Sequence, residues 1–168
     1  MAIRKSTWVI FGILVISACI LGSAVQAGAQ TSTLNEYWAA WNSHDAEKLV
    51  SFFTDDFVYE ELGLGVIKHG KEEFRAFIKG FFANFPDTNF EMKSSFISGD
   101  WYCGEWVWIG TYKGNAPGVP AAGKRFSIRG VSVGELKEGK IKRHSDYYNR
   151  MDFFQQLGVK LVPASPPK

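Results

Sequence analysis

The sequence predicts a single α+β domain, in which a strongly curved antiparallel sheet wraps as a cone around N-terminal helices. Apolar residues recur at helical spacing in the first half of the chain, whereas apolar and polar residues alternate in the second half as they do in strands. Helices that precede strands, rather than alternating with them, indicate the α+β class. The 168 residues suffice for one domain with its own core, and the 15% aromatic content suits a fold with large buried or cavity-lining rings.

The first 29 residues have the layout of an export signal. Arg4 and Lys5 make a basic start, Trp8–Leu21 is a short apolar run, and Ala27–Ala29 is a small-residue cleavage signal. The apolar run is short for a membrane span, so a retained membrane anchor is the weaker alternative. We therefore predict that residues 1–29 direct export to the periplasm or to the outside of the cell.

Cys19 introduces a second way of processing this segment. Ile16–Cys19 resembles a bacterial lipobox, in which the cysteine is lipidated and becomes the new N-terminus. Apolar sequence continues past Cys19, which favours ordinary cleavage after Ala27 or Ala29. Both alternatives export the mature domain, and a lipid on Cys19 is the only membrane attachment expected.

Removal of this segment leaves a domain with balanced charge. The signal holds two of the 19 basic residues and none of the 17 acidic ones. A neutral domain without a basic run offers no electrostatic surface for nucleic acid, so no nucleic-acid partner is expected. Cys103 is the only cysteine left, so no internal disulfide can form, and we expect Cys103 to be a small buried hydrophobic residue.

Three helices are predicted in the first half of the mature domain, residues 30–158. Leu34–Trp41 has helical spacing and is broken by residues 42–44. Asp45 caps the second helix. The inner face of that helix is expected to carry Leu49, Phe52 and Phe53.

A short strand over Phe57–Leu62 leads into a glycine turn at residues 63–65. The third helix is predicted over residues 71–84, and Pro86 stops it. Its apolar stripe consists of Phe74, Phe77, Ile78 and Phe81.

The second half of the chain predicts strands over residues 90–96, 101–112 and 125–136. The loop KGNAPGVPAAGK, residues 113–124, is expected to form a flap over the mouth of the cone. In the third of these strands the apolar positions change parity at Arg129-Gly130, which predicts a β-bulge there.

Glu138-Gly139 predicts a hairpin turn into the final strand, residues 141–150, whose alternation places His144, Asp146 and Tyr148 on one face. A short helix over residues 151–157 and a Pro-rich tail, residues 159–168, close the chain. A bent sheet around a long helix leaves an apolar cavity at its open end, which is where a small ligand is expected to bind.

Three stretches carry a family resemblance: YWAAWNSHDAEKLVSFFTDDFVYEELG, HGKEEFRAFI and PGVPAAGKRFSIRGVSVGELKEGKIKRHSDYYNRMDFFQQLG. They resemble the SnoaL-like polyketide cyclases of the nuclear-transport-factor-2-like superfamily, which includes ketosteroid isomerase and limonene epoxide hydrolase. The resemblance covers residues 33–158 and implies a cystatin-like α+β barrel.

The resemblance also implies roles for four side chains. Tyr37 matches the tyrosine that holds an oxyanion in ketosteroid isomerase, and Glu61 falls where that isomerase keeps its carboxylate base. Asp146 resembles the acid/base aspartate that the epoxide hydrolases, and the cyclases, carry on their late strand. His144 lies two residues earlier on the same face. The catalytic candidates are therefore Asp146, His144, Tyr37 and Glu61.

The sequence departs from its relatives at three places. Val131 stands where ketosteroid isomerase has a second oxyanion acid, and residues 105–108 lack the Arg-x-Asp pair of limonene epoxide hydrolases. Asn149 replaces an aspartate that relatives often carry. These differences argue against those two named reactions.

The chemistry implied is acid/base catalysis without a metal or cofactor. A carboxyl group in an apolar cavity should have a raised pKa, which suits a general base such as Asp146. It could take a proton from a carbon beside a carbonyl while the Tyr37 hydroxyl stabilises the enolate. Each candidate also has a structural alternative: Asp146 could bond Arg143 or backbone, His144 could orient Asp146 or be a solvated neighbour, Tyr37 could be a packed core tyrosine, and Glu61 a solvated loop acid.

Six aromatic residues are expected to contact the ligand: Trp41, Tyr59, Trp106, Trp108, Tyr112 and Tyr148. Alternatively, Trp106, Trp108 and Tyr112 form an exposed sheet surface through which the protein makes a homodimer.

Two functions remain open from the sequence. The first is an exported enzyme that acts on a small carbonyl or polyketide-like compound as a cyclase, isomerase or related lyase or hydrolase. The second is a module that binds a small apolar ligand, or dimerises, without catalysis.

Overall fold

The structure is a computed structural model, which describes residues 32–114, 116, 119–120 and 123–160. The predicted export signal, Cys19 and most of the Pro-rich tail therefore lie outside the described residues. Among the helices that are described, none combines the length and the apolar character needed to cross a membrane.

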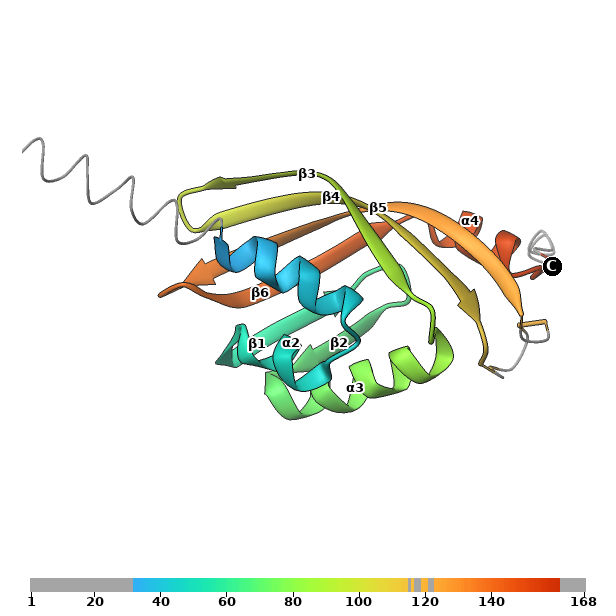
Figure 1. The fold of residues 1–168 in the computed structure, drawn as a ribbon, viewed down its shortest axis with the longest axis horizontal. Helices are drawn as coiled ribbons and strands as arrows, with labels where there is room; N and C mark the ends of the chain where they lie inside the picture. Colours follow the sequence, from blue (N-terminus) through green and yellow to red (C-terminus); the bar gives the residue numbers. More distant parts are fainter. Residues whose placement is uncertain (1–31, 115, 117–118, 121–122, 161–168) are drawn as a thin grey trace, which may run out of the picture.

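One curved, open sheet of six strands forms the body of the domain (Figure 1). The strands follow the order β2-β1-β6-β5-β4-β3 across the sheet. They are β1 (Phe53–Glu61), β2 (Val66–His69), β3 (Asn89–Ser98), β4 (Trp101–Tyr112), β5 (Lys124–Lys137) and β6 (Lys140–Tyr148). Neighbouring strands are antiparallel except for β1 and β6, which pair in parallel.

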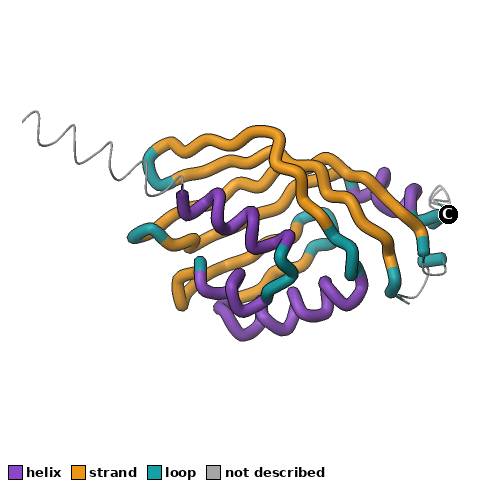
Figure 2. Tube along the Cα trace, in the orientation of Figure 1, coloured by secondary structure: helices purple, strands orange, loops and turns teal. Residues whose placement is uncertain are grey.

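The helices lie on the concave side and at one end of the sheet (Figure 2). A first helix, residues 32–42, lies in the concavity and is followed by α2 (Ala46–Ser51) and α3 (Gly70–Asn84). α3 packs on β1 and β2, and α4 (Arg150–Gln156) packs on β5. The predicted α+β class with a curved sheet around N-terminal helices is confirmed.

The N-terminal caps of α2 and α4 follow local sequence signals. Asp45 caps α2 as predicted, because its side chain accepts a hydrogen bond from the Lys48 N–H. Asn149 caps α4 in the same way, accepting from the Asp152 N–H at 3.1 Å. Asn149 therefore has a structural role in this chain.

The first strand begins earlier than predicted, at Phe53 rather than Phe57. Phe52 ends α2, and its carbonyl accepts a hydrogen bond from the Ile141 N–H at 2.8 Å. Pairing with β6 therefore draws Phe53 out of the helix, although its ring stays fully buried and stacks on Phe57.

Strand β2 is absent from the sequence prediction. It has only four residues, it lies at the edge of the sheet, and its apolar residues Val66 and Ile67 are adjacent rather than alternating. It forms because the turn at residues 62–65 returns the chain along β1, where Val66 pairs with Glu61.

The predicted bulge at Arg129-Gly130 is wrong. β5 pairs with β4 in unbroken register from Lys124 to Glu135. The inward positions continue through Gly130, Ser132 and Gly134, while the valines between them lie on the outer face. A Cβ at Gly130 or Gly134 would overlap the ring of Trp106 or of Tyr102, so large rings on β4 leave room only for small residues on β5.

The final hairpin forms where predicted. Glu138 and Gly139 both have positive φ, 52° and 75°, as a two-residue turn between twisted strands requires. β6 then carries His144 and Asp146 into the buried interior of the domain.

Candidate functional site

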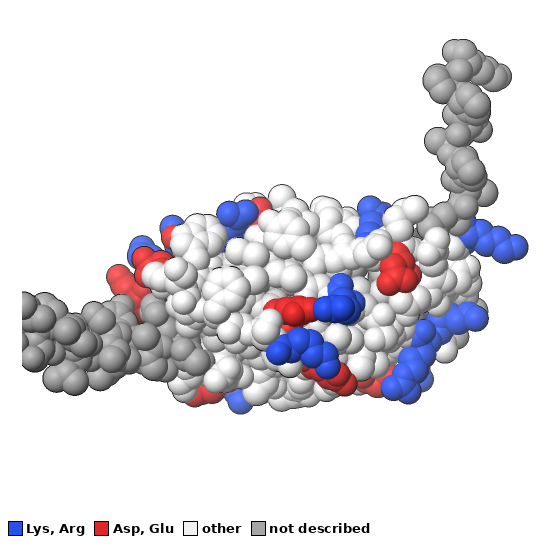
Figure 3. Space-filling view, turned by 90° about the horizontal axis from the view of Figure 1, so that it is seen from above, with Lys and Arg blue, Asp and Glu red and all other residues white. Residues whose placement is uncertain are grey.

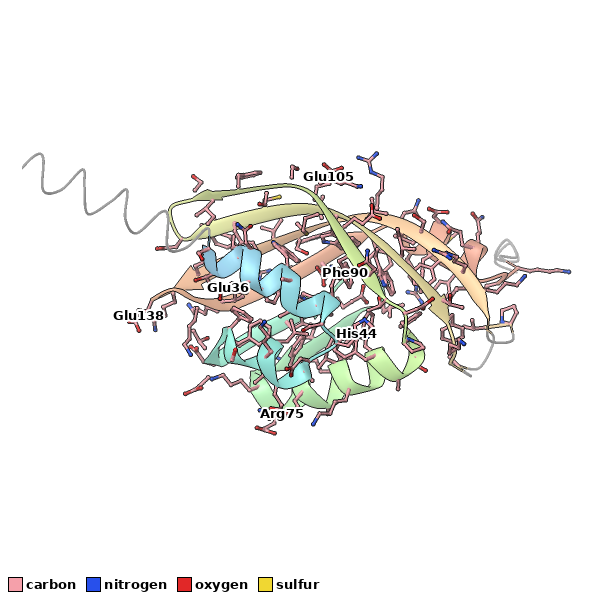
Figure 4. The ribbon with its side chains drawn as sticks, in the orientation of Figure 1. Glu36, His44, Arg75, Phe90, Glu105 and Glu138 are labelled. Atoms are coloured by element: carbon pink, nitrogen blue, oxygen red, sulfur yellow. The ribbon has the colours of Figure 1, made fainter. Side chains whose placement is uncertain are left out.

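A mostly apolar cavity of about 170 Å³ lies between the concave face of the sheet and α3. Aromatic rings form most of its wall, including Phe90 of β3, which Figure 4 labels beside the end of the first helix. The predicted ligand contacts Trp41, Tyr59, Trp106, Trp108 and Tyr148 all line it. The acidic and amide residues in its lining are Asp146, Glu61 and Asn84.

Tyr112 does not line the cavity, in contrast to the prediction. Its ring is buried against Phe85, and its hydroxyl accepts a hydrogen bond from the Ala116 N–H at 2.7 Å. Tyr112 therefore anchors one end of the loop between β4 and β5, whose role as a flap stays a prediction.

Asp146 projects from β6 into the cavity, where its side chain is 13% exposed. Its Oδ1 accepts hydrogen bonds from Ser132 Oγ at 2.5 Å and from His144 Nε2 at 2.9 Å. Its Oδ2 accepts one from the Tyr59 hydroxyl at 2.9 Å. A carboxylate has about four lone-pair positions, so one position on Oδ2 stays without a donor in the described structure.

Strand register explains why these groups meet. Ser132 of β5 lies opposite Asp146, and on the other side of β6 Tyr59 of β1 lies opposite His144. Arg143 faces the other side of the sheet and pairs with Glu60 at 2.7 Å. Asp146 is therefore not the partner of Arg143, which was its structural alternative.

The pKa of Asp146 is lowered, whereas a raised pKa was predicted for a carboxyl group in an apolar cavity. Burial alone would raise its pKa, but His144 and the hydrogen bonds from His144, Ser132 and Tyr59 outweigh burial and place the pKa below its ordinary value. The apolar cavity therefore does not keep a proton on this carboxyl group, because three donors replace the water that burial removes.

His144 lies behind Asp146 and is fully buried, outside the cavity lining. Its Nδ1 meets the hydroxyl groups of Tyr102 at 2.6 Å and Tyr37 at 3.3 Å. Its Nε2 lies 2.9 Å from Asp146 Oδ1, so a proton on Nε2 is directed at the carboxylate. His144 therefore holds and polarises Asp146 rather than meeting a ligand.

Tyr37 is a packed core residue whose hydroxyl reaches His144 and not the cavity. Burial, followed by the charge of Asp146, raises its pKa, so the phenol keeps its proton. The predicted contact of Tyr37 with a substrate oxygen is thus not available in this geometry.

Glu61, at the end of β1, is brought beside Asp146 by the parallel pairing of β1 and β6. It is buried, with only 6% of its surface exposed, so it is not a solvated loop acid. Its Oε2 accepts the Leu64 N–H at 2.6 Å, whereas its Oε1 is buried without a hydrogen-bond partner at bonding geometry. Burial raises its pKa, and the nearby Tyr148 and backbone N–H groups offset this only in part.

Two residues of the hydrogen-bond network around Asp146 and His144, Tyr102 and Ser132, were not predicted from the sequence. Tyr102 shares the parity of Trp106 and Trp108 along β4, so its inward position was predictable from alternation. Ser132 was missed because the assumed bulge placed Val131 and Val133 on the inner face. Without that bulge, alternation from Phe126 puts Ser132 inside.

Trp106 and Trp108 point inward, where their indole N–H groups donate to Ser132 at 2.8 Å and to Thr88 at 2.5 Å. With Tyr112 they are buried, so they do not form the exposed aromatic band that was the alternative for these residues. The described residues contain no cluster of three or more side chains suited to holding a metal ion.

Comparisons with known proteins agree on one family. The model of the SnoaL-like polyketide cyclases matches residues 31–157. The aklanonic acid methyl ester cyclase DnrD of Streptomyces peucetius is 30% identical over 115 residues, covering 62% of this chain and 79% of that protein. The corresponding cyclase DauD of Streptomyces sp. strain C5 is 26% identical over 125 residues, covering 71% of this chain and 75% of that one.

Solved structures share the fold. A protein with a ketosteroid isomerase-like fold from Catenulispora acidiphila, in complex with trimethylamine, aligns with a TM-score of 0.67 at 21% identity, covering 78% of this chain and 97% of that chain. TsrD from Streptomyces laurentii aligns with a TM-score of 0.69 at 21% identity, covering 79% and 97%.

Proposed function

The chain belongs to the SnoaL-like polyketide cyclase family, and from this premise we propose that its cavity closes a ring in a small carbonyl or polyketide-like compound by acid/base chemistry. The observation that carries the proposal is Asp146, a carboxyl group that lines an apolar cavity and accepts three hydrogen bonds. Isomerisation by the same proton transfer is the related alternative.

Asp146 acts as the base in this proposal. Its Oδ2 takes a proton from a carbon next to a carbonyl group, and the resulting enolate attacks a second carbonyl within the same molecule. His144, Ser132 and Tyr59 fix the carboxylate so that its free lone pair points at the substrate. The reaction moves only protons and electron pairs, so the proposal includes no cofactor.

The aromatic wall defines the class of substrate. Trp106, Trp108 and Phe90 offer flat apolar surfaces against which a fused or conjugated ring system can stack. DnrD and DauD are named for aklanonic acid methyl ester, which is therefore the first compound to test.

The experiment compares the wild type with Asp146→Asn. We expect turnover of aklanonic acid methyl ester to fall by about 10²–10⁴-fold, because the amide cannot accept the proton. Binding of the compound, followed by tryptophan fluorescence, should change little. Asp56→Asn, an exposed position on β1, serves as the matched control and should leave turnover unchanged.

Full activity of Asp146→Asn would refute the assignment of the base. A wild-type protein that binds this compound and a panel of related polyketides without converting any of them would instead support the second function, a binding module.

We also propose that residues 1–29 export the domain and that two copies pair through the outer face of the sheet. Figure 3 looks onto that face, which shows broad uncharged areas between a few charged side chains. Phe96, Trp101 and Tyr147 are exposed there, and half-buried Cys103 lies beside Phe96. Light scattering at high concentration should report a dimer, and a monomer would contradict the pairing.

A further inference from the structure

The unpartnered oxygen of Glu61 distinguishes it from Asp146, the other carboxyl group of the cavity, whose two oxygens both accept hydrogen bonds. The residue is only 6% exposed, and its Oε1 is buried without a hydrogen-bond donor at bonding geometry. A bare carboxylate oxygen in such a place loses its hydration without compensation. A protonated carboxyl group avoids much of this cost and offers an O–H to whatever occupies the cavity.

One neighbour of Glu61, the carboxylate of Asp146, also favours a proton on this group. Asp146 lies directly across the strand pair, and its negative charge opposes a second negative charge beside it. The other titratable groups that face Glu61 are Tyr59 of β1 and Tyr148 of β6, both neutral phenols whose pKa values are raised by burial. Tyr148 and the backbone N–H groups of Leu64 and Gly63 favour the ionised form of Glu61, but burial outweighs them and its pKa is raised, whereas the pKa of Asp146 is lowered.

We propose that Glu61 is the general acid of the ring closure, delivering its carboxyl proton to the substrate oxygen that becomes negatively charged when Asp146 has removed a proton from carbon. This inference rests on the proposed function and adds a second catalytic residue to it. Glu61 thus takes the part that the sequence analysis assigned to the Tyr37 hydroxyl.

The proton balance closes within the pair. The C–H bond of the donor carbon breaks, its proton goes to Asp146 Oδ2, and its electron pair forms the new C–C bond to the acceptor carbonyl carbon. The π electrons of that carbonyl move to its oxygen, which takes the proton of Glu61. After the step Asp146 carries a proton and Glu61 is ionised, so transfer of one proton between these neighbours restores the starting state.

Glu61 also has a structural contact, and the test must separate the two roles. Its Oε2 accepts the Leu64 N–H in the turn between β1 and β2. Glu61→Gln keeps an oxygen for this hydrogen bond but cannot release a proton. Glu60→Gln is the matched control, because Glu60 is the next residue on β1 and pairs with Arg143 outside the cavity.

The first measurement is infrared spectroscopy of the protein without substrate, at about pH 7, where ordinary carboxyl groups are ionised. We expect the C=O stretch of a protonated carboxyl group in the wild type and in Glu60→Gln, and its loss in Glu61→Gln. A wild type without this band, or a band that survives in Glu61→Gln, would overturn the proposal. The infrared measurement decides whether Glu61 is protonated even if aklanonic acid methyl ester is not a substrate.

The second measurement is the pH dependence of turnover. Glu61→Gln should lower kcat by about 10²–10⁴-fold with little change in KM, and the decline of the rate at high pH, where Glu61 loses its proton, should disappear. Glu60→Gln should retain the wild-type profile. Turnover by Glu61→Gln within about twofold of wild type would refute the role of Glu61 as the acid.

Discussion

Two carboxyl groups on neighbouring strands, Asp146 and Glu61, differ in what surrounds them. Asp146 receives hydrogen bonds from two side-chain hydroxyl groups and one imidazole, whereas Glu61 receives one from a backbone N–H. Their pKa values are shifted in opposite directions, below the ordinary value for Asp146 and above it for Glu61. Opposed shifts within one cavity are the usual mark of a base and an acid that work together.

These opposed shifts predict opposite effects of pH on stability. The folded state holds the Glu61 proton more tightly than the unfolded chain, so wild-type stability falls as pH rises from about 4.3 through the folded pKa. Glu61→Gln has no such group to titrate. In urea denaturation, the free energy of unfolding of the variant should therefore rise relative to that of the wild type over this pH range.

Asp146 should show the reverse in the same experiment. The pKa of Asp146 is lowered in the folded state, so its contribution to the free energy of unfolding is complete above about pH 3.9 and is lost as the pH falls through the folded pKa. The stability lead of the wild type over Asp146→Asn should therefore shrink only in acid. Differences that do not vary with pH for either variant would contradict both assignments.

The position of Tyr37 gives a prediction for the buried phenols. Tyr37→Phe should keep kcat within about threefold of wild type and lose roughly 0.5–1.5 kcal/mol of unfolding free energy, because the hydroxyl bonds only His144 at long range. Tyr102→Phe removes the shorter bond to the same nitrogen and should cost more. A hundredfold loss of kcat in Tyr37→Phe would mean that this hydroxyl reaches the substrate after all.

At the scale of elements, strand β5 shows where sequence patterns succeed and fail. Alternation located its span to within one residue, but Val131 and Val133 suggested an inner face that they do not occupy. The inner positions hold Gly130 and Gly134, because rings of β4 fill the space. Alternation within one strand carries no information about the size of its neighbours, so the error could not be detected from β5 alone.

A substitution at Gly130 tests this packing. Gly130→Ala should lower the unfolding free energy by about 1–3 kcal/mol, because the new methyl group would overlap the Trp106 ring. Ser127→Ala, at an exposed position on the same strand, is the control and should stay within about 0.5 kcal/mol in urea denaturation. Equal stability of the two variants would show that Trp106 can move aside at no cost.

At the scale of the whole molecule, the order of helices and strands was enough to predict the fold class and an apolar cavity. It was not enough to predict that β1 pairs with β6, because residues such as Tyr59 and Asp146 are 87 positions apart and meet only through tertiary structure. The sequence pointed to Asp146 on the late strand as the proposed base, while its hydrogen-bond donors Ser132 and Tyr59 depend on register between strands.

The N-terminal segment gives a prediction about the complete chain. If residues 1–29 direct export, the exported protein should begin after Ala27 or Ala29, or carry a lipid on Cys19. N-terminal sequencing and intact mass of material from outside the cytoplasm distinguish these forms. A chain that still starts at Met1 would contradict the signal assignment.

The parallel pairing of β1 with β6 joins two segments that lie far apart in the sequence, Phe53–Glu61 and Lys140–Tyr148. A folding intermediate in which β6 has not yet docked holds Glu61 in place but not Asp146. Chemical competence would then arise abruptly, when β6 docks beside β1. The loop between β4 and β5 lies between Glu61 and Asp146 in the sequence. Cleavage in this loop would give two fragments, each with one of the two acids. Recovery of turnover after mixing the fragments would then report their reassembly.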